Sequence, residues 1–240
     1  LPDAEMLVTE RPGRLRRISP SGAVSEPISG LPAIFVDGQA GLLDVAVSPT
    51  FATDQLVYVS FAEPTLRGNK AGTAVLRGRL QGDALLDVEV IYRQAPKLSH
   101  GTHVGSRLVF DDAGHLFITH GDNRVAAAAA QELDKLPGKL VRIWPDGRVP
   151  DDNPFVDRGG ARPEIWSYGH RNMQGAALHP VTRQIWTTEH GPMGGDELNI
   201  PQAGRNYGWP VITHGIDYSG KPVPGSTGKS APGMEQPHHV

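Results

Sequence analysis

The sequence of 240 residues contains no cysteine. Disulfide bonds, zinc–thiolate centres and thiol nucleophiles are therefore excluded. The chain also has no excess of positive charge, because its formal net charge is −3 at pH 7, and nucleic acid is not expected as a partner. No apolar stretch approaches the ~20 residues that a transmembrane helix needs, so we expect no membrane span.

Glycine and proline are plentiful, with 29 and 21 residues. Against a hydrophobic content of 38%, this excess predicts many tight turns in a chain that still builds a core. The length suits one large all-β domain or two small ones.

Four segments share a pattern of apolar strand, turn and second strand. They begin at Leu1, Val47, Val109 and Leu178. The strands MLVTE, LVYVSF, LFITH and IWTT alternate in polarity and are rich in β-branched and aromatic residues. Their spacing, roughly 45 to 70 residues, suits the blades of a β-propeller with loops of variable length. A β-sandwich is the alternative.

Other segments extend this pattern. GRLRRISPSGAV and GKLVRIWPDGRV each predict a strand, a turn and a second strand. AAAAAQELDKL, residues 126–136, predicts a helix of two or three turns. The strand pattern stops near the end of the sequence, and four blades do not comfortably close a ring, so we expect the chain to be part of a longer propeller.

Polar residues stand beside several of these strands. SHGTHVGSRLVF places His100, His103 and Arg107 directly before a strand. Loops at one end of a propeller converge on its channel, where a histidine could act as a general base. A surface histidine is the alternative, because the chain has ten.

SYGHRNMQG, residues 167–175, holds Arg171, Asn172 and Gln174 between two glycines. The fixed cation could bind a carboxylate or stabilise an oxyanion, although an ordinary turn would look similar. Gln39 precedes one strand and Asp122 follows another. Either of these two residues could equally belong to a turn.

WTTEHGPMGGDELN, residues 186–199, is either a hairpin or a cation-binding loop. Gly191 and Pro192 could turn carbonyl groups inward, and Asp196 and Glu197 add negative charge. Calcium prefers such oxygen ligands, although no EF-hand spacing is present.

The motifs GLLDVAVSP, HVGSRLVFDDAGHLFITHGDN, EIWSYGHRNMQG, EHGPMGGDELN and NYGWP, in this order, resemble the soluble pyrroloquinoline-quinone (PQQ)-dependent aldose sugar dehydrogenases, relatives of soluble quinoprotein glucose dehydrogenase. The resemblance implies a six-bladed β-propeller, of which this chain covers about four blades. It also implies PQQ and Ca²⁺ at the channel mouth. Residues 1–240 would form a single propeller domain, truncated at both ends and mostly at the C-terminus.

The resemblance also implies roles for individual residues. His103 is expected to take the proton of the sugar C1 hydroxyl, while the hydride passes to C5 of PQQ and the lactone forms. Asp122 would orient His103, and Arg171 would supply a positive charge beside the quinone oxygen. The residues expected to bind cofactor or sugar are Gln39, Arg171, Asn172 and Gln174.

The calcium ions have their own expected ligands. The resemblance assigns the cofactor calcium to the carbonyls of Gly191 and Pro192, with Asp196 nearby. Glu197 and Tyr207 resemble a second, structural calcium site.

The chain departs from this family in its extent. The last two blades, which supply further cationic contacts to PQQ, are absent, so we expect these 240 residues alone to bind PQQ poorly. The resemblance implies a periplasmic or secreted protein that acts on an aldose. It leaves the electron acceptor and the oligomeric state open, with a homodimer among the alternatives.

Two other function classes compete with this interpretation. A calcium-dependent propeller lactonase would need several direct carboxylate ligands to its metal and would hydrolyse lactones without PQQ. A non-enzymatic binding propeller would have no need for both His103 and Arg171.

Overall fold

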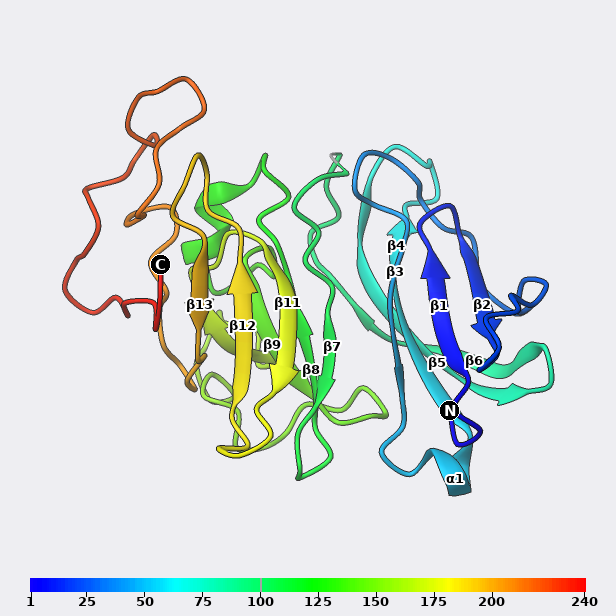
Figure 1. Ribbon diagram of the computed structural model, residues 1–240. Coiled ribbons are helices and arrows are strands. Elements are labelled where there is room, and N and C mark those ends of the chain that lie inside the picture. Colours follow the sequence, from blue (N-terminus) through cyan, green and yellow to red (C-terminus); the bar gives the residue numbers. More distant parts are fainter. Residues whose placement is uncertain (100) are drawn as a thin grey trace. The chain divides into compact units, whose positions relative to one another are not determined.

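The computed structural model describes residues 1–99 and 101–240 and consists almost entirely of antiparallel β-sheets (Figure 1). The chain divides into two compact units, Leu1–Thr102 and His103–Val240. Each unit has its own sheets and is described separately.

The first unit contains a hairpin and a four-stranded sheet. The hairpin pairs β1 with β2, and the sheet has the order β3-β4-β5-β6. The element bounds are β1 Met6–Glu10, β2 Arg14–Ile18, β3 Leu42–Val47, α1 Phe51–Asp54, β4 Leu56–Pro64, β5 Ala71–Gln81 and β6 Ala84–Arg93. Val59, Phe61 and Leu76 on the two central strands are fully buried, because alternate side chains of a strand point to the same face.

The second unit contains the two sheets that carry most of the candidate site residues. One has the order β10-β9-β8-β7 and the other β11-β12-β13. The bounds are β7 Leu108–Phe110, β8 Leu116–Thr119, β9 Lys139–Ile143, β10 Ile165–Tyr168, β11 Met173–Leu178, β12 Ile185–Glu189 and β13 Glu197–Asn199.

The predicted strands are present in the structure. MLVTE forms β1, and the other three segments fall in β4, β8 and β12. Neighbours in each sheet are consecutive in the chain, which is the meander of a propeller blade. That residues 1–240 make a single domain stays a prediction. Among the described residues, no helix is long and apolar enough to cross a membrane.

The helix predicted over residues 126–136 is wrong. Only a short 3₁₀ helix, η1 (Ala127–Gln131), forms there. The buried ammonium group of Lys139 donates to the carbonyl oxygens of Ala129, Ala130 and Pro137 at 2.6, 3.1 and 3.0 Å. Lys139 thus draws these carbonyl oxygens toward its side chain, and the backbone turns extended at Glu132, so the alanine run ends after one short 3₁₀ helix.

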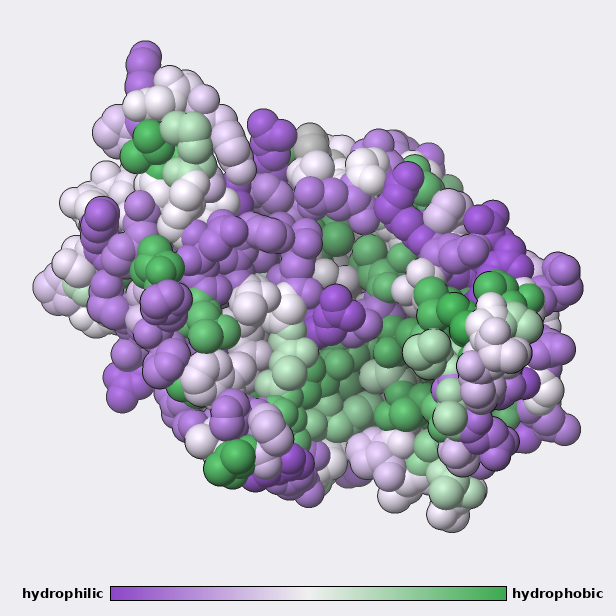
Figure 2. Space-filling view, in the orientation of Figure 1, coloured by the Kyte–Doolittle hydropathy of each residue, from purple (hydrophilic) through white to green (hydrophobic). Residues whose placement is uncertain are grey.

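The chain beyond β13 has little regular structure. In Figure 2, the loop after this strand carries a small group of hydrophobic residues among hydrophilic ones. In the same segment of the chain, Ile216 and Tyr218 are exposed by 43% and 69%. A few exposed apolar side chains are usual on a protein surface and do not by themselves indicate a binding site.

Stability should depend on pH through His120. Burial lowers the pKa of its imidazole from 6.5 to about 4. Between these values the unfolded chain binds a proton that the folded chain does not, so the contribution is full above pH 6.5 and is lost as the pH falls toward 4. We predict a loss on the order of 3 kcal/mol from this group, measured by urea unfolding at pH 7 and pH 4.5.

The matched variants are His120→Gln and His179→Gln. The first should lose less stability between these pH values than the unsubstituted protein. The second alters a histidine that accepts from the turn at Val181 and Thr182 and stacks on Trp186, and its loss of stability between the two pH values should match that of the unsubstituted protein. Equal acid loss in all three proteins would contradict the assignment to His120.

Candidate active site

His103 lies before β7 and contacts Asp122, which follows β8. The distance from His103 Nδ1 to Asp122 Oδ1 is 2.7 Å. A carboxylate only accepts, so Nδ1 carries the proton and Nε2 keeps a lone pair. Gly121 makes this approach feasible, because a Cβ there would lie 1.9 Å from the carbonyl oxygen of His103. The pair therefore has the geometry of an oriented general base.

The Asp122 carboxylate is almost completely buried, with 1% of its side chain exposed. Its Oδ1 also accepts the backbone N–H of Arg124 at 2.7 Å, and its Oδ2 accepts the indole N–H of Trp209 at 2.8 Å. Three donors thus compensate the burial of this charge.

Arg171 places a buried cation in the same unit. Its side chain donates through Nη1 to the carbonyl oxygens of His190 and Gly191, at 2.8 and 2.6 Å. Its guanidinium carbon lies 5.3 Å from the centre of the Trp209 ring. Its Nε has no hydrogen-bond partner, and among the described residues the guanidinium donates to carbonyl oxygens rather than to a carboxylate. A buried cation without a counter-ion favours an anionic ligand.

A buried network holds the Arg171 backbone. The Glu189 carboxylate accepts the backbone N–H of Arg171 and the Nδ1 proton of His170, the latter at 2.9 Å. His170 Nε2 lies 2.9 Å from Ser167 Oγ. Asp122 donates its own backbone N–H to the Arg171 carbonyl at 2.8 Å. These contacts tie the residue that carries the cation to the residue that orients the base.

The other predicted residues lie as follows. Asn172 accepts the Gly105 N–H through Oδ1 at 3.3 Å, which places it beside the His103 segment. Gln174 sits at a bulge of β11, and its carbonyl accepts from Arg107 Nε at 3.2 Å. Gln39 belongs to the first unit, where its backbone N–H donates to the Gly101 carbonyl oxygen at 2.6 Å. His100 lies outside the described residues.

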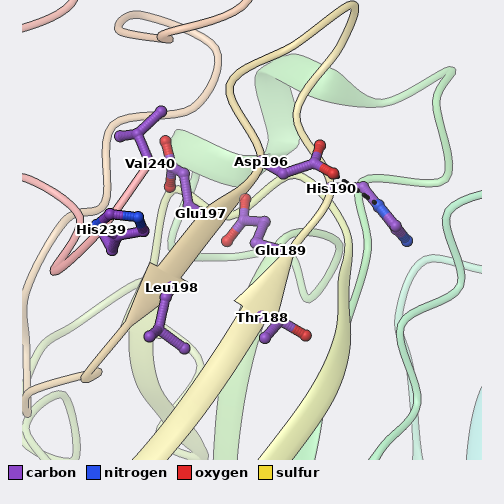
Figure 3. A pocket seen from close by; sticks show the side chains of 8 residues that line it. All are labelled: Thr188, Glu189, His190, Asp196, Glu197, Leu198, His239 and Val240. Carbon is purple, nitrogen blue, oxygen red and sulfur yellow. Dashed lines mark ion pairs between the residues drawn. The ribbon is translucent and has the colours of Figure 1, made fainter.

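The loop after β12 is shaped by Asp196. Its Oδ1 accepts the Gly191 N–H at 2.9 Å, and its Oδ2 lies 3.6 Å from His190 Nδ1. Figure 3 shows Asp196 directed toward His190 while Glu197 lies beside Glu189. Asp196 and Glu197, although adjacent in sequence, therefore contact different groups.

Glu197 on β13 is paired in register with Glu189 on β12. Burial and the charge of Glu189 raise the pKa of Glu197 to about 8. Both acids line a cavity of 330 Å³ together with residues such as His239. A positive charge would relieve the repulsion between these carboxylates.

Tyr207 uses its hydroxyl group within the protein. The hydroxyl donates to the Ile200 carbonyl at 2.9 Å and accepts the Gln202 N–H at 3.0 Å. Burial raises the pKa of Tyr207 to about 12. A metal role for this residue would therefore use its backbone carbonyl.

The structure contains no cluster of three or more His, Cys, Asp or Glu side chains suited to a metal, as far as its described residues extend. A cation on the loop after β12 would thus depend on backbone oxygens for much of its coordination.

Sequence reasoning missed Trp209 and Glu189 as parts of the site. Both stood in quoted motifs, NYGWP and TTEHG. The functional signal was weak, because a tryptophan and a strand-end glutamate are usual in a β-protein. Their importance depends on contacts to residues 87 and 18 positions away.

Comparison with known proteins matches residues 1–240 to a model of the family described as Glucose / Sorbosone dehydrogenase. The chain belongs to this family. An aldose sugar dehydrogenase of Escherichia coli is 51% identical over 240 residues, which cover 99% of this chain and 64% of that protein.

Solved structures agree with this membership. A crystal structure of a glucose dehydrogenase is 55% identical, with a TM-score of 0.96 over all of this chain and 69% of its own. The PQQ-bound form of an aldose sugar dehydrogenase from Streptomyces coelicolor is 28% identical, with a TM-score of 0.81 over 99% of this chain and 64% of its own. The predicted family and the propeller fold class are confirmed, and the chain spans about two thirds of these relatives.

The hydrogen bonds that the Glu189 carboxylate accepts should contribute to the free energy of unfolding. We predict that Glu189→Gln lowers the free energy of unfolding by about 2–3 kcal/mol, because the new NH₂ group faces N–H donors. Urea unfolding at pH 8 with EDTA measures this loss.

Glu197→Gln is the matched control on the facing strand. The raised pKa of Glu197 means that its stabilising contribution is full below about pH 4.5 and is lost as the pH rises through about 8. Replacing this acid should therefore leave stability unchanged or raise it by about 1 kcal/mol at pH 8. Equal losses in both variants would contradict the network.

Proposed function

We propose that the full-length protein oxidises aldose sugars at C1 to lactones, with PQQ and Ca²⁺ as cofactors. The proposal rests on the Arg171 guanidinium, which is buried, has no carboxylate partner among the described residues, and belongs to one network with the His103–Asp122 pair. A base that can accept a hydroxyl proton and a cation that can hold an anionic cofactor are the two groups this oxidation requires from the protein.

The residues present suit PQQ by their charge. PQQ carries three carboxylates and an ortho-quinone, and Arg171 lacks any carboxylate partner within the described structure. One lone pair of the Gly191 carbonyl accepts from Arg171, which leaves the second for another cation. An anion bound at this place would offset the repulsion between that cation and Arg171.

When bound, PQQ supplies a hydride acceptor, and Ca²⁺ increases the electrophilicity of its quinone carbon. The protein's own side chains accept the proton that leaves the sugar. His103, whose Nδ1 proton is engaged by Asp122, takes the C1 hydroxyl proton at Nε2, and the Asp122 carboxylate stabilises the resulting imidazolium. Arg171 adds positive charge where negative charge develops.

We assign the remaining predicted residues by their surroundings. The carbonyls of Gly191 and Pro192, with Asp196, would hold the cofactor calcium. Glu197, with the carbonyl of Tyr207, would hold a second ion. Asn172 and Gln174 would contact cofactor or sugar, and the contact expected of Gln39 rests on the family resemblance alone.

We predict that His103→Ala in the full-length protein lowers kcat by about 10²–10⁴-fold, because the general base is lost. PQQ affinity should change little, because His103 is assigned to the sugar hydroxyl. Dye-linked aldose oxidation measures the first quantity, and titration with PQQ measures the second.

His179→Ala is the control, and it should keep full activity. An active His103→Ala protein would overturn the role of the base. Lactone hydrolysis by the full-length protein without PQQ would instead support the lactonase alternative.

A further inference from the structure

We propose that Trp209 is a positioning residue for the reaction, acting on His103 through Asp122. This inference rests on the proposed function for its catalytic consequence. The contact itself does not depend on that function. One indole N–H fixes the carboxylate that orients the base, and all of the residues involved lie in the second compact unit.

The Asp122 carboxylate has its two oxygens held separately. His103 Nδ1 and the Arg124 amide both engage Oδ1, while Oδ2 receives the indole N–H of Trp209 at 2.8 Å. Without the indole donor, Oδ2 would be buried and unsatisfied, since only 1% of the Asp122 side chain is exposed. The carboxylate would then gain by rotating or by admitting water, and either change loosens its hold on His103.

Trp209 can fix Asp122 because it is itself fixed. Its backbone N–H donates to the Gly169 carbonyl at 2.9 Å, and its own carbonyl accepts from Gln131 Nε2 at 2.7 Å. The side chain packs on Ala130 and Val223 in a small buried cluster. The short η1 helix therefore contributes to this site, because it carries Ala130, which packs with Trp209, and Gln131, which donates to the Trp209 backbone carbonyl.

The face of the same ring lies against Arg171. The guanidinium carbon is 5.3 Å from the ring centre, within the range of a cation–π contact. Trp209 thus has two separable contacts, an N–H to the carboxylate and a π-face to the cation. Phenylalanine keeps an aromatic face and has no N–H, so Trp209→Phe tests the first contact alone.

We expect Trp209→Phe in the full-length protein to lower kcat by about ten- to hundredfold, the effect of losing a hydrogen bond to a charged group. The aldose KM and the PQQ affinity should stay within about twofold, because the π-face is retained. Trp166→Phe is the matched control. It also loses an indole hydrogen bond, to the Pro201 carbonyl at 3.2 Å, and should keep kcat within about twofold.

A double variant separates positioning from general damage. If Trp209 acts through Asp122, then Trp209→Phe added to Asp122→Asn costs no further activity. If Trp209 only supports the fold, the two losses multiply, and the proposal is overturned. Unchanged kcat in Trp209→Phe alone would overturn it as well.

A second readout does not depend on turnover. NMR of the protein with labelled histidine observes the Nδ1 proton of His103, which should be strongly deshielded and protected by its bond to Asp122. Trp209→Phe should broaden this signal or move it upfield, and Trp166→Phe should not. An unaltered signal overturns the inference. If the unsubstituted protein shows no aldose oxidation but the signal responds, the proposed function fails while the positioning contact stands.

Discussion

The site depends on the burial of one carboxylate. Asp122 is withdrawn from water, and its charge is tolerated because His103, the Arg124 amide and Trp209 all donate to it. The Arg124 amide comes from the turn that follows Asp122, whereas His103 and Trp209 come from separate stretches of chain, so satisfying this charge also brings those stretches together. Its backbone N–H then binds the Arg171 carbonyl. Asp122 therefore orients the base through its carboxylate and is tied to the residue that carries the cation through its backbone.

The second charge is treated in the opposite way. Arg171 is buried, and among the described residues its guanidinium donates to two carbonyl oxygens and lies over an aromatic face, while its Nε has no hydrogen-bond partner. Within the part of the chain that the structure describes, these partners hold the guanidinium in place without neutralising its charge. The two buried charges thus differ in their partners. The Asp122 carboxylate has its hydrogen bonds satisfied within the protein, whereas the Arg171 guanidinium can still bind an anionic ligand.

The sequence predicted the parts that repeat or that belong to local motifs. Alternating strands located β1, β4, β8 and β12, and the motif resemblance identified the family. The alanine run at 126–136 failed, because helix propensity is a local quantity and Lys139 acts on it through tertiary contact. Trp209 and Glu189 were missed for the same reason, since their partners are distant in sequence. Residue type alone does not reveal which carbonyls and carboxylates converge.

We propose that these groups prepare the full-length protein to oxidise an aldose through a bound quinone. The most direct measurement follows the absorbance of the PQQ- and Ca²⁺-loaded full-length protein on rapid mixing with an aldose, with no other electron acceptor present. We expect the spectrum of the oxidised cofactor to convert to that of the reduced cofactor in a single turnover. An oxidised spectrum that persists at saturating aldose, with PQQ shown to be bound, would contradict it.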